Sequence, residues 1–347
     1  MSAPIRAAVI GVGVFGRNHA RVLFELQKTG QAELVAVCDA NPERAAEIAM
    51  EFRCQAFTSL DQLLTKAKLD AAVVSVPTVH HLATARTLME AGVDVLIEKP
   101  IAASLAEADE LMNIARQNNR VAMVGHLERF NPAVRAALPL LTQPMFYEVH
   151  RLSIFTPRSL DVDVVLDLMI HDIDVLLAMV QSPVREVRAV GIPVISSKVD
   201  IANVRLEFES GCVANLTASR VSTERVRRMR FFQPHQYISI DYAKQDVFAL
   251  TVDEKTLATQ SFEDLMFAPQ APGAPPIPGV KLERPEVHRE EPLLAEHKAF
   301  LKAVRERSTP EVSLEDGRRA LAVALDIHAA MEEHHERAGL AQMAVRR

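Results

Sequence analysis

The sequence predicts an α/β protein of two domains that meet near residue 127. Over the first 125 residues, valine-rich apolar segments alternate with segments of helical periodicity, which is typical of a parallel sheet with helices on both faces. Beyond residue 127, strand-like segments follow one another through short turns, which favours an antiparallel sheet. We therefore expect one domain over residues 1–127, and an α+β domain with a large, mainly antiparallel open sheet over 128–347.

The N-terminal domain should contain strands that are apolar on both faces, as buried parallel strands are. The expected strands are 7–10, 34–38, 71–76, 93–97 and 121–124. The expected helices between them are 16–27, 42–52, 80–91 and 104–117. Two of these helices have clear start signals, because Pro42 follows Asn41 and Ser104 precedes a periodic apolar segment.

The C-terminal domain should combine helices with a run of antiparallel strands. The expected helices are 129–141, 163–180, 292–305 and 314–339. The expected strands are 145–152, 184–193, 202–209, 212–221, 225–232, 237–241 and 247–252. The segment 268–285 is rich in proline and glycine, so we expect an extended loop there.

Composition argues against several classes of protein. The net charge is −6, from 39 basic and 45 acidic residues, whereas a nucleic-acid binder should have a basic excess. No apolar segment approaches the ~18 residues of a membrane helix, and the N-terminus has no signal-peptide layout. The three cysteines, Cys38, Cys54 and Cys212, are far apart. We therefore expect no disulfide framework, no metal site and a reducing, cytoplasmic environment.

A glycine-rich loop, Gly11-Val12-Gly13-Val14-Phe15-Gly16, follows the first expected strand and opens the first helix. In this context the first glycine makes a tight turn, the second lets the backbone approach a pyrophosphate, and the third lets the helix pack on the strand. The helix N-terminus would hold the anionic pyrophosphate. The pattern predicts a Rossmann dinucleotide-binding domain, and the alternative is a glycine turn in another kind of α/β protein.

Asp39 is the second signal for a dinucleotide. It lies 23 residues beyond Gly16, close to the ~20 residues expected for the carboxylate that binds the adenosine ribose hydroxyls. A carboxylate there favours NAD and repels the additional phosphate of NADP. Arg44 could weaken that preference, so NADP stays as the alternative. Without a dinucleotide, Asp39 would be an ordinary helix-start residue.

Candidate catalytic residues follow the strand 93–97 and lie along one helix. Lys99 should point toward the cofactor crevice, because ligands bind at the carboxyl ends of parallel strands, although a surface lysine fits the spacing equally well. Within the helix 163–180, spacings of three and four place four polar residues on one face. They are Asp163, Asp167, His171 and Asp174. Asp167 beside His171 suits a general base in a polar cleft, and the alternative is a solvated stripe on a packed helix.

These motifs together resemble the glucose–fructose oxidoreductase/inositol dehydrogenase (Gfo/Idh/MocA) family over nearly the whole chain. The resemblance rests on the glycine loop, Ser75-Val76-Pro77-Thr78 with His81, Glu98-Lys99-Pro100, Arg129-Phe130-Asn131-Pro132, and Asp167 with His171-Asp172-Ile173-Asp174. It implies an NAD-dependent oxidoreductase that acts on CH–OH groups. It also implies a cis Lys99–Pro100 bond and a homodimer or homotetramer built on the open sheet.

The resemblance further implies a role for each site residue. Lys99 should hydrogen-bond the reacting hydroxyl and stabilise its developing negative charge, and His171 should take the hydroxyl proton. Asp167 should orient His171 or contact a neighbouring hydroxyl, while hydride passes to the nicotinamide. The residues expected to contact the cofactor are Gly11, Gly13, Val14, Phe15, Gly16, Asp39, Arg44, Ser75, Pro77, His81, Glu98 and Lys99.

The segment 124–132 is similar to the branch of the family that oxidises UDP-N-acetylglucosamine at C3. The 3-keto product of that branch feeds an aminotransferase in lipid A biosynthesis. A sugar-nucleotide diphosphate needs cations, and arginine forks match its oxygens. The residues expected to bind substrate are His126, Arg129, Asn131, Arg151, Arg158, Asp167, His171 and Arg228. Arg129 could instead be structural or face the cofactor, and the arginine-rich strand 225–232 could face solvent or an oligomer partner.

Two other functions stay open. A free polyol or sugar such as inositol could be the substrate, in which case affinity would not depend on phosphate. A non-catalytic NAD-binding regulator would bind the cofactor without turnover. The presence of Lys99, Asp167 and His171 argues against the regulator.

Overall fold

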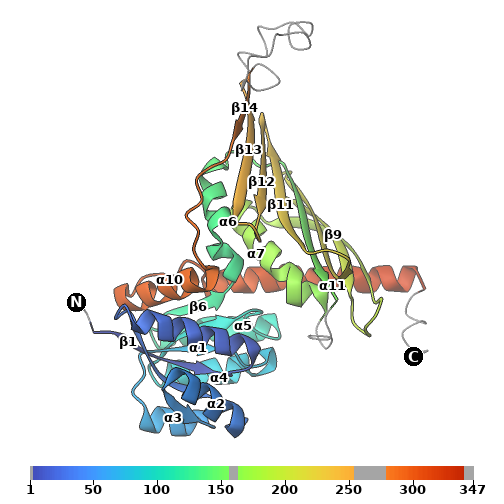
Figure 1. Cartoon of the computed structure of the whole chain (residues 1–347). Helices are drawn as coiled ribbons and strands as arrows, with labels where there is room; N and C mark the ends of the chain where they lie inside the picture. Colours follow the sequence, from blue (N-terminus) through green and yellow to red (C-terminus); the bar gives the residue numbers. More distant parts are fainter. Residues whose placement is uncertain (1–2, 156–162, 254–278, 340–347) are drawn as a thin grey trace, which may run out of the picture. The chain divides into compact units, whose positions relative to one another are not determined.

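A computed structural model describes residues 3–155, 163–253 and 279–339, which form two compact units (Figure 1). The first unit contains the residues up to 130 together with 290–322, and the second contains 131–289 together with the residues from 323 onward. The sequence predicts residues 290–322 as part of the C-terminal domain. The structure corrects this, because helix α10 (Pro292–Glu306) packs against helix α1 and the 3-10 turn η2 (Leu127–Phe130) of the first unit.

The first unit has a six-stranded parallel sheet in the order β3-β2-β1-β4-β5-β6. Its strands are β1 (Ile5–Ile10), β2 (Ala32–Cys38), β3 (Gln55–Phe57), β4 (Ala71–Val74), β5 (Asp94–Glu98) and β6 (Ala122–Gly125). The chain starts in the middle of the sheet, runs to the β3 edge and returns to β4. The strand order therefore reverses between β1 and β4, the place where open α/β sheets bind ligands.

The helices of this unit begin close to where the sequence predicts. They are α1 (Val14–Gln27), α2 (Pro42–Phe52), α3 (Leu60–Lys66), α4 (His81–Glu90), α5 (Leu105–Gln117) and α10, with a 3-10 turn η1 (Thr78–His80) before α4. The side chains of Asn41 and Ser104 cap α2 and α5 as expected. Strand β3 and helix α3 were not predicted, since a three-residue strand is too short to show a period.

The second unit contains an eight-stranded sheet in the order β14-β13-β12-β11-β7-β10-β9-β8. Its strands are β7 (Phe146–Ile154), β8 (Val184–Ile192), β9 (Ile201–Phe208), β10 (Val213–Ser222), β11 (Val226–Gln233), β12 (Gln236–Asp241), β13 (Asp246–Val252) and β14 (Val280–Glu283). All neighbours are antiparallel except β7 and β10, which confirms the mainly antiparallel sheet. Strand β14 corrects the loop expected over 268–285, of which 268–278 lie outside the described residues.

One helix expected to be continuous is broken in the structure, and another contains a π turn. The segment 129–141 divides into η2, α6 (Pro132–Ala137) and a 3-10 turn η3 (Leu138–Leu140), because Asn131 starts a new helix by accepting from Ala133 N at 3.1 Å. The segment 163–180 begins as a π-helical turn, η4 (Val165–Met169), and continues as α7 (Ile170–Met179).

The last helix, α11 (Leu314–Arg337), starts in the first unit and ends in the second. Within the ranges that the structure describes, no helix has the length and apolar character needed to cross a membrane.

Candidate active site

The glycine loop packs tightly against the end of strand β4. Gly11 has a φ of +83°, and a Cβ atom there would lie 2.5 Å from Ser75 O. A Cβ atom on Gly16 would overlap the carbonyl of Gly11, whereas a Cβ atom on Gly13 would meet nothing within 4 Å. The loop is therefore closed on its protein side and open at Gly13, the N-cap of the 14-residue helix α1. This geometry fits a pyrophosphate held by the loop and the helix N-terminus.

Two residues hold this loop, Asp39 just after β2 and Arg44 in the first turn of α2. Asp39 accepts hydrogen bonds from Val12 N at 2.8 Å and from Asn41 N at 2.9 Å. Arg44 donates to Val12 O at 2.7 Å and pairs with Glu47 at 2.7 Å. Each carboxylate oxygen of Asp39 keeps further lone pairs, because a carboxylate can accept about four hydrogen bonds. The residues therefore fit a ribose with free hydroxyls beside the loop.

Lys99 follows strand β5 with a half-buried side chain, and the Lys99–Pro100 peptide bond is cis, as the family resemblance implied. His81 secures this segment. Its ring is 1% exposed, with Nδ1 at 3.0 Å from Pro100 O and Nε2 at 2.9 Å from Val76 O. Burial lowers the pKa of His81. The sequence predicts His81 as a cofactor contact, whereas in the structure each of its ring nitrogens faces a backbone carbonyl oxygen.

The other residues expected at the cofactor also gather at the carboxyl edge of the parallel sheet. Val14 and Phe15 start α1 with exposed side chains, Ser75 is half-buried after β4, and Pro77 is exposed beyond it. Glu98 is buried at the end of β5. Strands β1, β2, β4 and β5 thus bring the expected residues together because parallel strands all end at one edge.

The four polar residues of the helix 163–180, which are Asp163, Asp167, His171 and Asp174, have different surroundings in the second unit. Asp163 accepts from Val165 N at 2.8 Å and Leu166 N at 3.2 Å, and it pairs with His328 at 3.1 Å. Asp174 is buried in α7. Asp167 lies in the π turn η4 and His171 near the start of α7, and both are half-buried. Because π turns are frequent at functional sites, Asp167 and His171 remain the candidate catalytic residues of the second unit.

Two of the residues expected to bind substrate have structural partners in the second unit, and one lies outside the described ranges. Arg151 is 2% exposed and makes a two-point ion pair with Asp172 of α7, at 2.6 and 2.8 Å. Its guanidinium also lies 5.3 Å from the Tyr242 ring. Asn131 is buried, caps α6 and donates to Tyr242 O at 3.1 Å. Arg151 and Asn131 thus stabilise the fold, which corrects their assignment as phosphate or sugar ligands. Arg158 lies outside the described residues.

Arg228 lies on the opposite sheet face from helix α7. Arg228 of β11 lies directly opposite His150 of β7 in the register of the sheet. Arg151, the next residue of β7, points to α7. Successive strand residues face opposite sides, so Arg228 and the half-exposed Arg230 share the open face. There Arg228 lies 3.6 Å from Asp241, and Arg230 lies 3.2 Å from Glu148. This arrangement favours the alternative that the arginine-rich strand faces solvent or an oligomer partner over a role of Arg228 as a substrate ligand.

His126 and Arg129 follow strand β6 in the first unit. His126 is 1% exposed just beyond Gly125. Arg129 lies in η2 with its guanidinium 4.0 Å from Asp316. The structure thus gives Arg129 an ion-pair partner from α11, which favours the structural role that the sequence left open.

The sequence did not reveal a buried cluster of polar residues at the carboxyl end of strand β5. His19, Glu98 and Glu296 are buried, and one ligand atom from each lies within 4.8 Å of the others, a group that could hold a metal ion. His19 contacts Glu98 Oε1 through Nε2 at 2.9 Å and His297 Nε2 through Nδ1 at 2.8 Å. These lengths are those of hydrogen bonds. No motif could have revealed the cluster, because its members come from distant segments.

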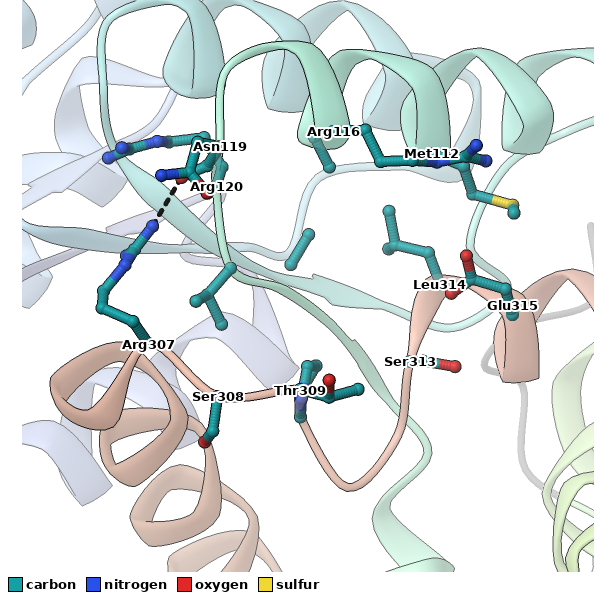
Figure 2. Close-up of a pocket in the computed structure, with 14 residues that line it drawn as sticks. Met112, Arg116, Asn119, Arg120, Arg307, Ser308, Thr309, Ser313, Leu314 and Glu315 are labelled. Atoms are coloured by element: carbon teal, nitrogen blue, oxygen red, sulfur yellow. Dashed lines mark hydrogen bonds between the residues drawn. The ribbon is translucent and has the colours of Figure 1, made fainter.

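A cavity of about 400 Å³ lies at the amino end of strand β6 (Figure 2). Arg116, Arg120 and Arg307 line it beside Ser308 and Glu315. Arg307 pairs with Asp94, the first residue of β5, and donates to Asn119 O. Because the glycine loop follows the carboxyl end of β1, this cavity lies at the other edge of the sheet from the expected cofactor site.

Comparison with known proteins matches both parts of the chain. A model of the Gfo/Idh/MocA oxidoreductase family with an NAD-binding Rossmann fold covers residues 5–126, and a model of the family's C-terminal domain covers 142–235. The UDP-N-acetylglucosamine 3-dehydrogenase of Acidithiobacillus ferrooxidans is 38% identical over 96% of this chain and 99% of its own length. A solved structure of that enzyme has a TM-score of 0.83 at 36% identity, covering 96% of this chain and 99% of that one. An inositol 2-dehydrogenase from Acidothermus cellulolyticus is 29% identical over 54% of this chain and 56% of its own length.

Proposed function

This chain belongs to the Gfo/Idh/MocA family of oxidoreductases, and we propose that it oxidises the C3 hydroxyl of UDP-N-acetylglucosamine with NAD, giving the 3-keto sugar nucleotide. The observation that carries this proposal is the likeness to the enzyme of Acidithiobacillus ferrooxidans, which extends over nearly the full length of both chains. A likeness confined to the Rossmann part would support only cofactor binding, because the substrate contacts of a two-domain dehydrogenase come largely from the second domain.

The contacts of Asp39 support NAD as the cofactor. Its carboxylate lies at the end of β2 and is fixed by two backbone N–H groups, which leaves lone pairs for ribose hydroxyls. Arg44 is the cation that could attract the NADP phosphate, and its guanidinium is engaged by the loop carbonyls and Glu47.

The proposed reaction divides its roles among three side chains. Lys99 donates a hydrogen bond to the reacting hydroxyl oxygen and stabilises the charge that develops there. His171 accepts the hydroxyl proton, and Asp167 orients His171 or binds a neighbouring hydroxyl. The nicotinamide, when bound, supplies the hydride acceptor. The buried His81 ring, with Nδ1 at 3.0 Å from Pro100 O, supports the segment that carries Lys99.

We also propose that the protein is a homodimer or homotetramer that associates through its second unit, and that an aminotransferase consumes the product. Exposed apolar side chains at one end of the sheet support the association. They are Val190, Ile192, Val194 and Ile195, in and after strand β8. Apolar side chains gathered in this way are typical of a surface that is covered in an assembly.

The proposal is tested by NADH formation from purified protein with NAD and UDP-N-acetylglucosamine. Free N-acetylglucosamine and myo-inositol are tested as substrates in parallel assays. A coupled aminotransferase removes the keto product if the equilibrium is unfavourable. We expect turnover with UDP-N-acetylglucosamine and with neither of the other two compounds. We also expect this turnover to be lost in Lys99→Met and in His171→Ala. Turnover with myo-inositol alone would contradict the substrate assignment.

Inositol is the second candidate substrate, favoured by the partial likeness to inositol 2-dehydrogenase. The two candidates differ in the diphosphate, so added UDP should inhibit an enzyme for the nucleotide sugar competitively. UDP should leave an inositol dehydrogenase unaffected. A non-catalytic regulator would bind NAD and turn over neither substrate.

A further inference from the structure

Two buried histidines form a hydrogen-bonded chain with Glu98 inside the first unit. His19 lies on α1, one turn after the glycine loop, and His297 lies on α10. His19 Nε2 is 2.9 Å from Glu98 Oε1, and His19 Nδ1 is 2.8 Å from His297 Nε2. Both imidazoles are 0% exposed and Glu98 is 8% exposed. The chain therefore joins the helix of the glycine loop to the strand end that carries Lys99.

The direction of these hydrogen bonds follows from the inventory of donors and acceptors. A carboxylate only accepts, so His19 Nε2 carries the proton that Glu98 receives. In a neutral His19 ring Nδ1 is then an acceptor, and His297 Nε2 must donate to it. The remaining nitrogen of His297, Nδ1, is buried and has no hydrogen-bond partner within the described residues. It is better left as an acceptor, because buried N–H groups without partners are rare.

The electrostatic surroundings support a neutral His297. Complete burial is the largest effect and holds the pKa of His297 well below the usual value, and the positive charge of Arg21 lowers it further. A neutral ring has one N–H group, which the bond to His19 uses. The two histidines are thus each locked in one tautomer by the hydrogen bond that the other nitrogen makes.

The Glu98 carboxylate is also fixed from the neighbouring strand. Glu98 pairs in register with Gly125, the last residue of β6. A Cβ atom on Gly125 would lie 2.6 Å from Glu98 Oε1, so the carboxylate occupies the space that any other residue would fill. The second oxygen of Glu98 accepts from Lys99 N at 3.3 Å. Contacts from α1, β6 and the Lys99 backbone together hold this carboxylate in one orientation.

We propose that His297 and His19 are positioning residues that act through Glu98 to hold the Lys99 backbone in its catalytic position relative to the glycine loop. The proposal rests on the role of Lys99 proposed above. Its physical basis is that proton transfer and hydride transfer require close alignment, and a displacement of about 1 Å can reduce the rate roughly 100-fold. A chain of buried hydrogen bonds from α1 to β5 transmits the position of the cofactor loop to the lysine.

The kinetic test compares two substitutions of His297 with a control on the same helix. His297→Phe removes the donor to His19, whereas His297→Gln retains a side-chain N–H. Phe300→Leu also disturbs α10, where Phe300 is buried, but it leaves the histidine chain intact. We expect His297→Phe to lower kcat by up to roughly 100-fold while the Kd for NAD changes less than about twofold. His297→Gln should recover most of the rate, and Phe300→Leu should lower only the Tm.

Some kinetic results would overturn the proposal. An unchanged kcat in His297→Phe would remove it. An equal loss of kcat in Phe300→Leu would show that α10 acts only through stability. In a Lys99→Met background, His297→Phe should cause no further loss, because the two changes act on one group. A full additional loss there would exclude action through Lys99.

Nitrogen-15 NMR of the histidine rings tests the chain without substrate or turnover. The expected spectrum of the apoenzyme has neutral His19 and His297 rings, each protonated at Nε2 and assigned by its loss in the corresponding variant. A positively charged His19 or an Nδ1–H tautomer of either ring would overturn the arrangement. A stoichiometric divalent ion in the purified protein would also overturn it, since His19, Glu98 and Glu296 would then be metal ligands. Failure of the proposed substrate would leave these spectra unchanged, so the two proposals fail separately.

Discussion

The parallel sheet of the first unit and the mixed sheet of the second arrange their polar residues by different rules. In the first unit, all strands end at one edge, and the glycine loop, Asp39, Ser75 and Lys99 gather there. In the second unit, neighbouring strands mostly run in opposite directions, so no single edge collects their ends. In this sheet, the face on which a side chain lies determines what it contacts. Arg151 points toward α7, whereas Arg228 lies on the opposite face.

This difference determines what a motif in the sequence can reveal. A residue just beyond a buried parallel strand lies at the ligand-binding edge whatever its neighbours are. An arginine in an antiparallel strand can face the core, solvent or a partner, and a one-residue difference in position reverses the answer. The five predictions below test this contrast from the largest expected effect to the smallest.

Arg151→Met should cause the largest loss of stability. It leaves the carboxylate of Asp172 buried without its two-point partner, and breaking a buried ion pair costs about 3–5 kcal/mol. Chemical denaturation measures the loss. The double variant Arg151→Met/Asp172→Leu should recover much of it, because no buried charge remains. A loss below about 1 kcal/mol in the single variant would show that Arg151 is a surface-like residue.

Lys99→Met should remove most of the activity and little of the stability. Loss of one hydrogen-bond donor to a developing oxyanion lowers kcat about 100- to 1000-fold. The side chain is half-buried, so the free energy of unfolding should change by less than about 1 kcal/mol. Initial rates of NADH formation measure the activity, and urea denaturation measures the free energy of unfolding. A variant with normal kcat would remove Lys99 from the reaction.

Gly13→Ala tests the open side of the glycine loop. A Cβ atom there meets nothing within 4 Å, so folding should be almost unaffected. A methyl group should still obstruct the approach of the pyrophosphate to the loop backbone. We expect the Kd for NAD to rise about tenfold, equivalent to about 1.4 kcal/mol. Isothermal titration would measure the change, and an unchanged Kd would place the pyrophosphate elsewhere.

Acid should weaken the first unit through its buried neutral histidines. Burial lowers the pKa of His81 and His297 in the folded protein below the ordinary value of 6.5. At a pH between the pKa of such a histidine in the folded protein and 6.5, the unfolded chain binds more protons than the folded protein. The free energy of unfolding is therefore highest above pH 6.5 and falls as the pH decreases. Each histidine contributes at most about 1.4 kcal/mol per pH unit.

Urea denaturation across this pH range checks the acid prediction. The dependence should become shallower in His297→Phe, where one of the two groups is gone. An unchanged slope in that variant would mean that His297 is already protonated in the folded protein.

Arg228→Met should have the smallest effect. Its side chain is 45% exposed and lies 3.6 Å from Asp241, and exposed ion pairs contribute about 0–1 kcal/mol. On the open face, the change should alter kcat/KM less than about twofold. A tenfold loss of affinity for UDP-N-acetylglucosamine would contradict this, and would mean that the open face reaches a substrate site.

The sequence by itself determined the order and type of most elements and the positions of the candidate catalytic residues. Local patterns suffice where physics is local, as with the caps at Asn41 and Ser104 and the tight turn at Gly11. The expectation for Lys99 combined the rule that ligands bind at the carboxyl ends of parallel strands with the family resemblance, because the spacing alone fits a surface lysine equally well. The very short strand β3 and the π turn η4 escaped because neither has a distinctive period.

Only the tertiary structure decided which polar residues serve the fold. The sequence predicts Arg151 as a phosphate ligand, but in the structure its guanidinium pairs with Asp172. The sequence predicts His81 as a cofactor contact, but in the structure two backbone carbonyl groups flank its ring. His19 and His297 are 278 residues apart and carry no shared motif, yet they touch in the core. A buried polar group must find a partner, and that partner is set by how distant segments pack, which spacing along the chain does not encode.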